Sequence, residues 1–384
     1  MKKFFLFFFI FFGWKSWCFT QTKDDFVTEI LQKIKFEQKT ADTSFFPKGI
    51  FPVYRQYDAN KKSVKADDNI FFNALICYTL KKLYPKFNFQ QKELVDSIYN
   101  ETLKVAHFYK NTKGRNTYNF WKTNPKRKVF PNSGWINWFD EVNALPDDMD
   151  DTAIMLLATS ADSAAAANVH SLMQNFINGN FSWVKNTLEA YKNIPAYSTW
   201  FGQKMPIDFD ACVMSNVLLM VQHNNLVWTK ADSASLQYIV EVIKNNHHIT
   251  KPQFIAPHYA KSSIFLYHIS RLMSEKPIAS LESLKPKLID DALVLYNSKV
   301  GIQEKILLIT ALKRLGYKPI PTMVLGDNWE KELATSNEAF FIANMASMAK
   351  NPYKKIIGNL GIGKFYYYCT AYNFTLLLES LMID

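Results

Sequence analysis

The segment NALPDDMDDTAIMLLA, residues 143–158, places four aspartates within five positions, directly ahead of an apolar run. One or two acidic residues at a helix start are stabilised by free backbone N–H groups and by the helix dipole. Four exceed that need, and the additional carboxylates repel one another unless they share a proton, bind a cation or face water. Asp147, Asp148, Asp150 and Asp151 are therefore candidates for acid chemistry or for metal binding.

The elements that must position these aspartates are predicted to be helices. Apolar residues recur at steps of three and four through most of the chain, as in IFFNALICYTLKKL at 70–83. Gly316 follows Leu315 as a helix-terminating residue. Strand-like alternation is hard to find. The periodicity predicts twelve helices, near 24–36, 71–83, 92–109, 151–160, 166–178, 209–222, 232–245, 262–274, 280–296, 302–315, 335–349 and 367–381.

These helices fall into a more apolar set and a more mixed set, and the two sets roughly alternate along the chain. The alternation predicts an all-α fold, an (α/α)6 toroid of six helical hairpins with the apolar set inside. An open α-solenoid is the alternative, although its repeats are usually more even in length. In a toroid the inner helices are parallel, so their N-terminal ends meet at one mouth. We expect three acidic helix starts there: Asp67 and Asp68, the 147–151 cluster, and Asp208 with Asp210.

Residues 1–20 have the features of a signal peptide. Two lysines precede an apolar run, Phe4–Trp14, which is too short to span a bilayer as a helix. We expect cleavage after Thr20, a single toroid domain over 21–384, and a periplasmic or secreted protein. An uncleaved N-terminal anchor is the alternative.

The charge and cysteine content of the chain limit the binding partners and the covalent cross-links that can be expected. The chain has 45 Lys and Arg against 34 Asp and Glu, a net charge of +11 that is spread along the sequence. This spread is typical of a solvated surface and is also compatible with peripheral contact with anionic membranes. We recognise no nucleic-acid-binding module, and we expect a monomer. Beyond the signal segment, Cys77, Cys212 and Cys369 are widely spaced, which favours buried thiols over a disulfide framework.

The longest interruption between predicted helices, residues 110–146, is rich in aromatic residues. Disordered segments are poor in aromatics, so we expect this one to be ordered and packed over something. Long ordered loops are often functional, and plain packing is the alternative. Trp121, Trp135 and Trp138 are candidates for the wall of a ligand pocket.

PDDMDDTAIML at 146–156 resembles the Pro-Asp-x-Asp-Asp-Thr-Ala segment of squalene-hopene cyclases, which are class II terpenoid cyclases. NSGWINW at 132–138 is similar to a Gly-Gly-Trp segment upstream of it. The resemblance implies that Asp150 protonates an alkene or epoxide, with Asp148 and Asp151 beside it. Close carboxylates raise one pKa, so that one of them stays protonated, and aromatic faces stabilise carbocations. The chain departs from that family in carrying Asp147 and in having room for one helical barrel where those enzymes have two.

DACVMSNVLLMV at 210–221 is similar to helices of the wider terpenoid-cyclase and prenyltransferase toroid superfamily. Its first residues resemble the Asp-x-Cys zinc half-site of protein prenyltransferase β subunits, which a later histidine completes. The resemblance implies Asp210, Cys212 and His258 as zinc ligands with one open position. A buried Cys212 and a surface His258 are the alternative.

Two further interpretations stay open. Toroids also host exported glycan-active enzymes, and Asp208 or Asp210 opposite Asp150, with Trp135 and Trp138 nearby, would form a separated carboxylate pair. The protein could also lack catalysis, with the acidic mouth holding Ca²⁺ or an aromatic cavity carrying a lipid. Our working prediction is an exported terpenoid-cyclase-like protein that acts on or holds an apolar isoprenoid. Its catalytic residues would be Asp148, Asp150 and Asp151, with no cofactor beyond the zinc or calcium just named and with Trp121, Trp135, Trp138 and Asp208 at the ligand.

Overall fold

The structure is a computed structural model. It describes residues 22–58, 60–125, 130–131, 146–202, 205–323, 325–336, 338–344, 356 and 363–384. Within these residues the chain is mostly helical, with one small antiparallel sheet.

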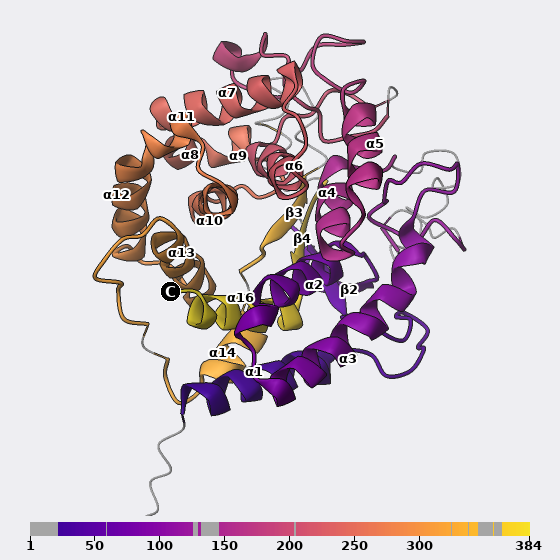
Figure 1. Cartoon of the computed structure of the whole chain (residues 1–384), viewed down its shortest axis with the longest axis vertical. Coiled ribbons are helices and arrows are strands. Elements are labelled where there is room, and N and C mark those ends of the chain that lie inside the picture. Colours follow the sequence, from indigo (N-terminus) through magenta and orange to yellow (C-terminus); the bar gives the residue numbers. More distant parts are fainter. Residues whose placement is uncertain are drawn as a thin grey trace, which may run out of the picture.

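Six strongly buried helices contact one another in a closed cyclic order, in which each helix packs against the next and the last against the first. Figure 1 shows them inside a second set of helices that lies further out. In cyclic order the inner helices are α2 (Phe71–Leu83), α4 (Met149–Ala158), α6 (Ala211–His223), α10 (Ser262–Glu275), α13 (Ile302–Arg314) and α16 (Thr370–Met382).

The outer helices bury one face only, as amphipathic surface helices do. Three of them begin with a capping box. In this motif the N-cap side chain accepts the backbone N–H of the third helical residue, and the side chain of that residue accepts the backbone N–H of the N-cap. The longer outer helices are α1 (Lys23–Glu37), α3 (Phe89–Ala106), α5 (Ser163–Met173), α7 (Lys230–Lys244) and α12 (Lys285–Tyr296). Shorter segments are α8 (His247–Thr250), α9 (Pro252–Ile255), α11 (Ala279–Glu282), α14 (Trp329–Ala334), η1 (Tyr84–Lys86), η2 (His107–Tyr109) and η4 (Glu189–Tyr191).

Helix α4 illustrates why the inner helices form where they do. Asp148 is its N-cap, with an extended backbone and a side chain that accepts a hydrogen bond from the N–H of Asp151. All ten residues of the helix are buried. A helix that is apolar on nearly every side is stable only when it is surrounded, which the central position of α4 provides.

A four-stranded antiparallel sheet is the main departure from the predicted all-α fold. Its strands are β1 (Val53–Tyr57), β2 (Asn60–Asp67), β3 (Phe341–Asn344) and β4 (Lys364–Tyr368), in the order β2-β1-β4-β3. β2 leads into α2 and β4 leads into α16, so the sheet lies at the end of the ring where those helices begin. The sheet therefore lies at the end of the ring that the sequence analysis predicted to be the open mouth of the toroid.

Three sequence predictions are wrong in detail. Of the helix expected near 335–349, residues 341–344 form strand β3 instead, after α14 has ended at Ala334, and residues 345–349 lie outside the described residues. The helix expected over 280–296 is two segments, α11 and α12, and a proline lies in the first turn of α12. The last inner helix begins at Thr370, since KFYYY before it forms β4 with alternate residues buried. Gly316 follows α13 with a φ of +71°, as predicted for a helix-terminating glycine.

Candidate functional site

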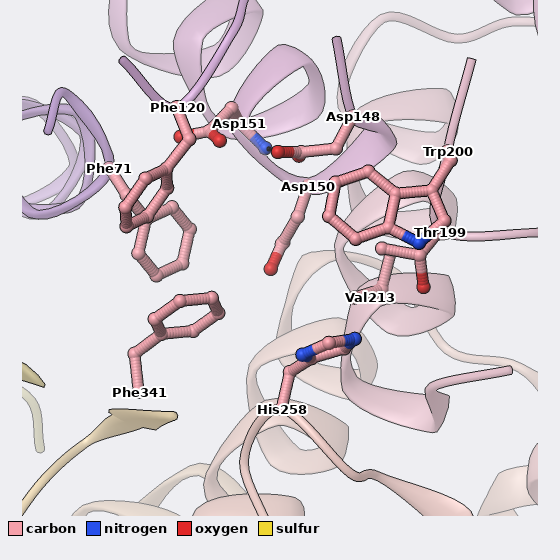
Figure 2. Close-up of a pocket in the computed structure, with 10 residues that line it drawn as sticks. All are labelled: Phe71, Phe120, Asp148, Asp150, Asp151, Thr199, Trp200, Val213, His258 and Phe341. Carbon is pink, nitrogen blue, oxygen red and sulfur yellow. Dashed lines mark hydrogen bonds between the residues drawn. The ribbon is translucent and has the colours of Figure 1, made fainter. Parts of the chain in front are cut away.

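A small pocket lies where the inner helices α4 and α6 begin, beneath the sheet (Figure 2). Its volume is about 30 Å³, more than the roughly 10–15 Å³ that one ordered water molecule requires. Five of its side chains are aromatic rings or apolar, three are carboxyls of the aspartate cluster, and an imidazole and a threonine complete it. The lining residues are Phe71, Phe120, Asp148, Asp150, Asp151, Thr199, Trp200, Val213, His258 and Phe341.

Phe341 of strand β3 closes the pocket from the sheet side. Its ring centroid lies 5.1 Å from that of Phe71, 5.5 Å from that of Phe120 and 6.2 Å from that of His258. The neighbouring Ile342 donates its N–H to the backbone oxygen of His258 at 2.8 Å, which fixes the strand over the site. The aromatic wall is therefore contributed by the sheet as well as by the helices.

Three of the four clustered aspartates line the pocket, and the fourth does not. Asp147 points away from it, where its carboxylate accepts hydrogen bonds from Asn111 and Thr117 at 2.6 and 2.5 Å. Asp147, the aspartate that the cyclase motif lacks, is therefore held by hydrogen bonds outside the pocket. Asp148, Asp150 and Asp151 are the three that the resemblance singled out, and the fold brings them to one pocket.

Asp150 is held by donors on both carboxyl oxygens. Asn216 of α6 donates to Oδ1 at 2.5 Å, and the hydroxyl of Tyr259 donates to Oδ2. Arg271 of α10 in turn donates to the amide oxygen of Asn216 at 2.5 Å. Burial raises the pKa of Asp150, while the two donors and the charges of Arg271 and His258 act in the opposite direction.

Asp148 and Asp151 form a coupled carboxyl pair. Asp148 accepts the backbone N–H of Asp151 at 2.7 Å, and the two side chains also share a hydrogen bond. Burial raises the pKa of Asp148 to about 6. Burial and the adjacent charge of Asp148 raise the pKa of Asp151 well above its usual range. This pair therefore holds a proton at neutral pH.

His258 is a buried cation beside the pocket. Its Nε2 contacts Asp208 Oδ2 at 2.6 Å and its Nδ1 lies 3.3 Å from the backbone oxygen of Ile342. Burial disfavours the charged ring, but the charges of Asp208 and Asp210 outweigh it and raise the pKa of His258 to about 9. Both ring nitrogens therefore donate, and His258 is an imidazolium at neutral pH. Asn186 donates to the other oxygen of Asp208.

The residues predicted to bind zinc are close in space but are used otherwise. Asp210 caps α6: one oxygen accepts the N–H groups of Cys212 and Val213, and the other accepts the N–H of His258 at 2.8 Å. Burial raises the pKa of Asp210 to about 7 and that of the Cys212 thiol well above its usual range. Among the described residues, no group of three or more His, Cys, Asp or Glu side chains is placed to hold a metal ion.

Of the carboxylates proposed for a glycan-active site, Asp150 lines the pocket, whereas Asp208 and Asp210 are not part of its lining. Asp208 is bound by His258 and Asn186, and Asp210 by backbone N–H groups. The cap role of Asp210 and the ion pair of Asp208 leave neither one facing Asp150 across an open space of the kind a sugar ring needs.

The tryptophans predicted as pocket walls have different outcomes. Trp121 is buried, but its indole N–H donates to Asp67 at 3.0 Å and its ring packs on Phe120 and Phe130, outside the pocket lining. Trp135 and Trp138 lie outside the described residues. The tryptophan that does line the pocket is Trp200, which the sequence analysis missed.

Several other site residues were missed for an identifiable reason. Asn216 and Arg271 lie on α6 and α10, where each fits the helical pattern, and Tyr259 lies in the segment between α9 and α10. Polar residues on an otherwise apolar inner helix were the available signal, since a buried polar group needs a partner. Phe341 gave no such signal, because its strand was predicted as helix.

In the part of the chain that the structure describes, no helix is long and apolar enough to cross a membrane. Comparison with known proteins does not add a family to these observations. No family model matches the chain, and neither a curated protein nor a solved structure matches it.

Proposed function

We propose that this chain is a single (α/α)6 toroid of the terpenoid-cyclase type, exported by its N-terminal segment. In this proposal it acts on or holds an apolar isoprenoid, with a carboxyl group at the start of α4 as the acid. The cyclic packing of the six inner helices supports the toroid. The small sheet is then an addition at the end where those helices begin.

One observation carries the functional proposal: three buried carboxyl groups from one helix start line a pocket whose other walls are largely aromatic or aliphatic. Protonating an alkene requires a carboxylic acid that keeps its proton at neutral pH, which the raised pKa of Asp151 provides. The carbocation formed needs nearby π faces, and Phe71, Phe120 and Phe341 supply them.

The size of the pocket sets a condition on this proposal. An isoprene unit is larger than the space of about 30 Å³, so binding requires a wall to move. Phe341 is the best-placed wall for such a movement, because β3 is the edge strand of the described sheet and pairs there with β4. Ligand entry would then separate Ile342 from His258, whose backbone bond anchors the strand.

The test is incubation of the purified protein with linear isoprenoids of increasing length in D₂O, followed by gas chromatography and mass spectrometry. A product isomer that carries one deuterium at carbon supports protonation by a solvent-exchanged acid. Unchanged isoprenoid that co-purifies with the protein supports the holding role. Failure of every isoprenoid to bind or react would reject the proposal.

Variants make this test specific to the site. Asp148→Asn, Asp150→Asn and Asp151→Asn should each alter turnover while circular dichroism shows an intact fold. The matched control is Asp162→Asn, because Asp162 caps α5 through Ala165 at an exposed position away from the pocket. Equal activity in the control and the three site variants would show that the reaction does not use these carboxyls. Export is tested separately, by the N-terminal sequence of the protein recovered outside the cytoplasm.

A further inference from the structure

The two carboxyl groups that face the aromatic wall differ in their partners. Figure 2 shows Asp150 reaching between Phe341 and His258, and Asp151 lying beside Phe120. Asp150 accepts on both oxygens, whereas Oδ1 of Asp151 is buried without a hydrogen-bond partner among the described residues. Their protonation states therefore follow from different surroundings.

The donors on Asp150 are fixed in orientation. A guanidinium group only donates, so Arg271 must face the amide oxygen of Asn216. The amide nitrogen of Asn216 then faces Asp150 and can only donate to it. This chain crosses three consecutive inner helices, α10, α6 and α4. It favours the ionised form of Asp150, because a carboxylate is acceptor-only.

The charge of Arg271 also requires an ionised partner. The side chain is 3% exposed, and rings of Tyr267 and Tyr78 lie 5.3 and 5.8 Å from its guanidinium carbon. The Glu379 carboxylate acts on this charge but is itself paired with Arg314. Arg271 also acts on Asp150, one amide away, and favours its ionised form.

Asp151 has the opposite surroundings. No cation contacts it among the described residues, and its side chain meets the carboxyl group of Asp148, which is held in place by the N–H of Asp151 itself. Two adjacent buried carboxyls do not both ionise, and the one without donors keeps the proton. Asp151 lines the pocket together with Phe71 and Phe120.

We propose that Asp151 is the proton donor of this site and that Asp150 is its resting carboxylate. This inference rests on the proposed function and departs from the role that the cyclase resemblance implies for Asp150. In the step, the O–H bond of Asp151 breaks as a C–H bond forms at one alkene carbon, which leaves a carbocation and the Asp151 carboxylate. The Asp150 carboxylate then takes a proton from a carbon next to the final cation, and a C=C bond forms again.

Several charged and titratable groups of the described residues surround this pair. Asp147 and Asp148 precede or begin α4, and Asp210 and Cys212 come from the start of α6. His258, Tyr259 and Arg271 come from α10 and the segment before it. Of these groups, Asp147 and Asp148 act on Asp151, whereas the cations His258 and Arg271 and the acid Asp210 interact with Asp150.

The test reads the free protein. Carboxyl ¹³C resonances of protein labelled at Asp Cγ are followed from pH 4 to pH 9, and Asp148→Asn, Asp150→Asn and Asp151→Asn assign the three signals. We expect the Asp151 carboxyl to be protonated at pH 7 and the Asp150 carboxyl to be ionised. A protonated Asp150 together with an ionised Asp151 at pH 7 would overturn the inference, as would ionisation of both.

A second variant keeps the inference falsifiable if a site variant does not fold. Arg271→Gln removes the compensating charge but retains an amide donor toward Asn216, so the Asp150 titration should move to higher pH. The Asp151 titration should stay in place, and equal shifts of both would contradict the division of roles. These titrations need no substrate, so their result does not depend on whether an isoprenoid is turned over. If Asp150 proved protonated and Asp151 ionised in a protein that turns over an isoprenoid, this inference would fail and the proposed function would remain.

Discussion

Replacing Asp208 with Asn should destabilise the fold in a way that depends on pH. Asp208 Oδ2 lies 2.6 Å from His258 Nε2 in a fully buried contact. The pKa of His258 is about 9 in the folded chain against 6.5 for an unperturbed histidine. A pKa raised on folding stabilises the protonated protein, so this stability is fully present below pH 6.5 and is lost as pH rises through about 9.

The size of the effect follows from that difference. One pKa unit corresponds to ~1.4 kcal/mol, so a difference of about 2.5 units amounts to roughly 3 kcal/mol. Breaking a buried ion pair by removing one partner costs about 3–5 kcal/mol in proteins generally, which is the same range. Wild-type stability should therefore fall by roughly 3 kcal/mol between pH 6.5 and pH 9 from this group alone, and Asp208→Asn should abolish that fall.

The assay is urea denaturation at half-unit steps from pH 6 to pH 9.5. Asp291→Asn is the matched control, because Asp291 bonds a second buried histidine, His248, at 2.8 Å. Burial lowers the pKa of His248 below 6.5, so this variant should keep the wild-type slope above pH 6.5. Parallel wild-type and Asp208→Asn stability curves across pH 6.5 to 9 would refute the reasoning.

Three further predictions concern neighbouring features. Asp210→Asn should remove most of a stability loss of up to ~4 kcal/mol between pH 4 and pH 7, because burial raises the pKa of Asp210 to about 7; denaturation curves that keep this slope would contradict it. Phe341→Ala should cost up to about 3 kcal/mol in denaturation, less than a core Phe because the ring is only partly buried, and should admit small apolar probes such as benzene, detectable by NMR shifts of pocket residues. Trp121→Phe should lower the free energy of unfolding by about 1.5–3 kcal/mol, because the hydrogen bond to Asp67 is lost, and should leave the affinity for probes or isoprenoids unchanged. A lower affinity at wild-type stability would instead show that Trp121 is part of the pocket wall.

The helices were predictable because their signal is local. Apolar periodicity located the inner helices, and the aspartates at 148 and 210 are the N-caps that their positions suggested. Periodicity failed at β3 and β4, where pairing with other strands of the sheet overrides the local pattern. Pairing between segments as distant as 53–57 and 364–368 leaves no mark on either segment alone.

The aspartate cluster shows the same division. Its composition by itself established that some carboxyls must share protons or find partners, because like charges at that spacing repel. Only the tertiary structure decided which ones. It turns Asp147 away to Asn111 and Thr117, gives Asp150 the Asn216 amide and the Tyr259 hydroxyl, and leaves Asp151 beside Asp148. Protonation depends on burial and on donors from other helices, and those are fixed when the ring closes.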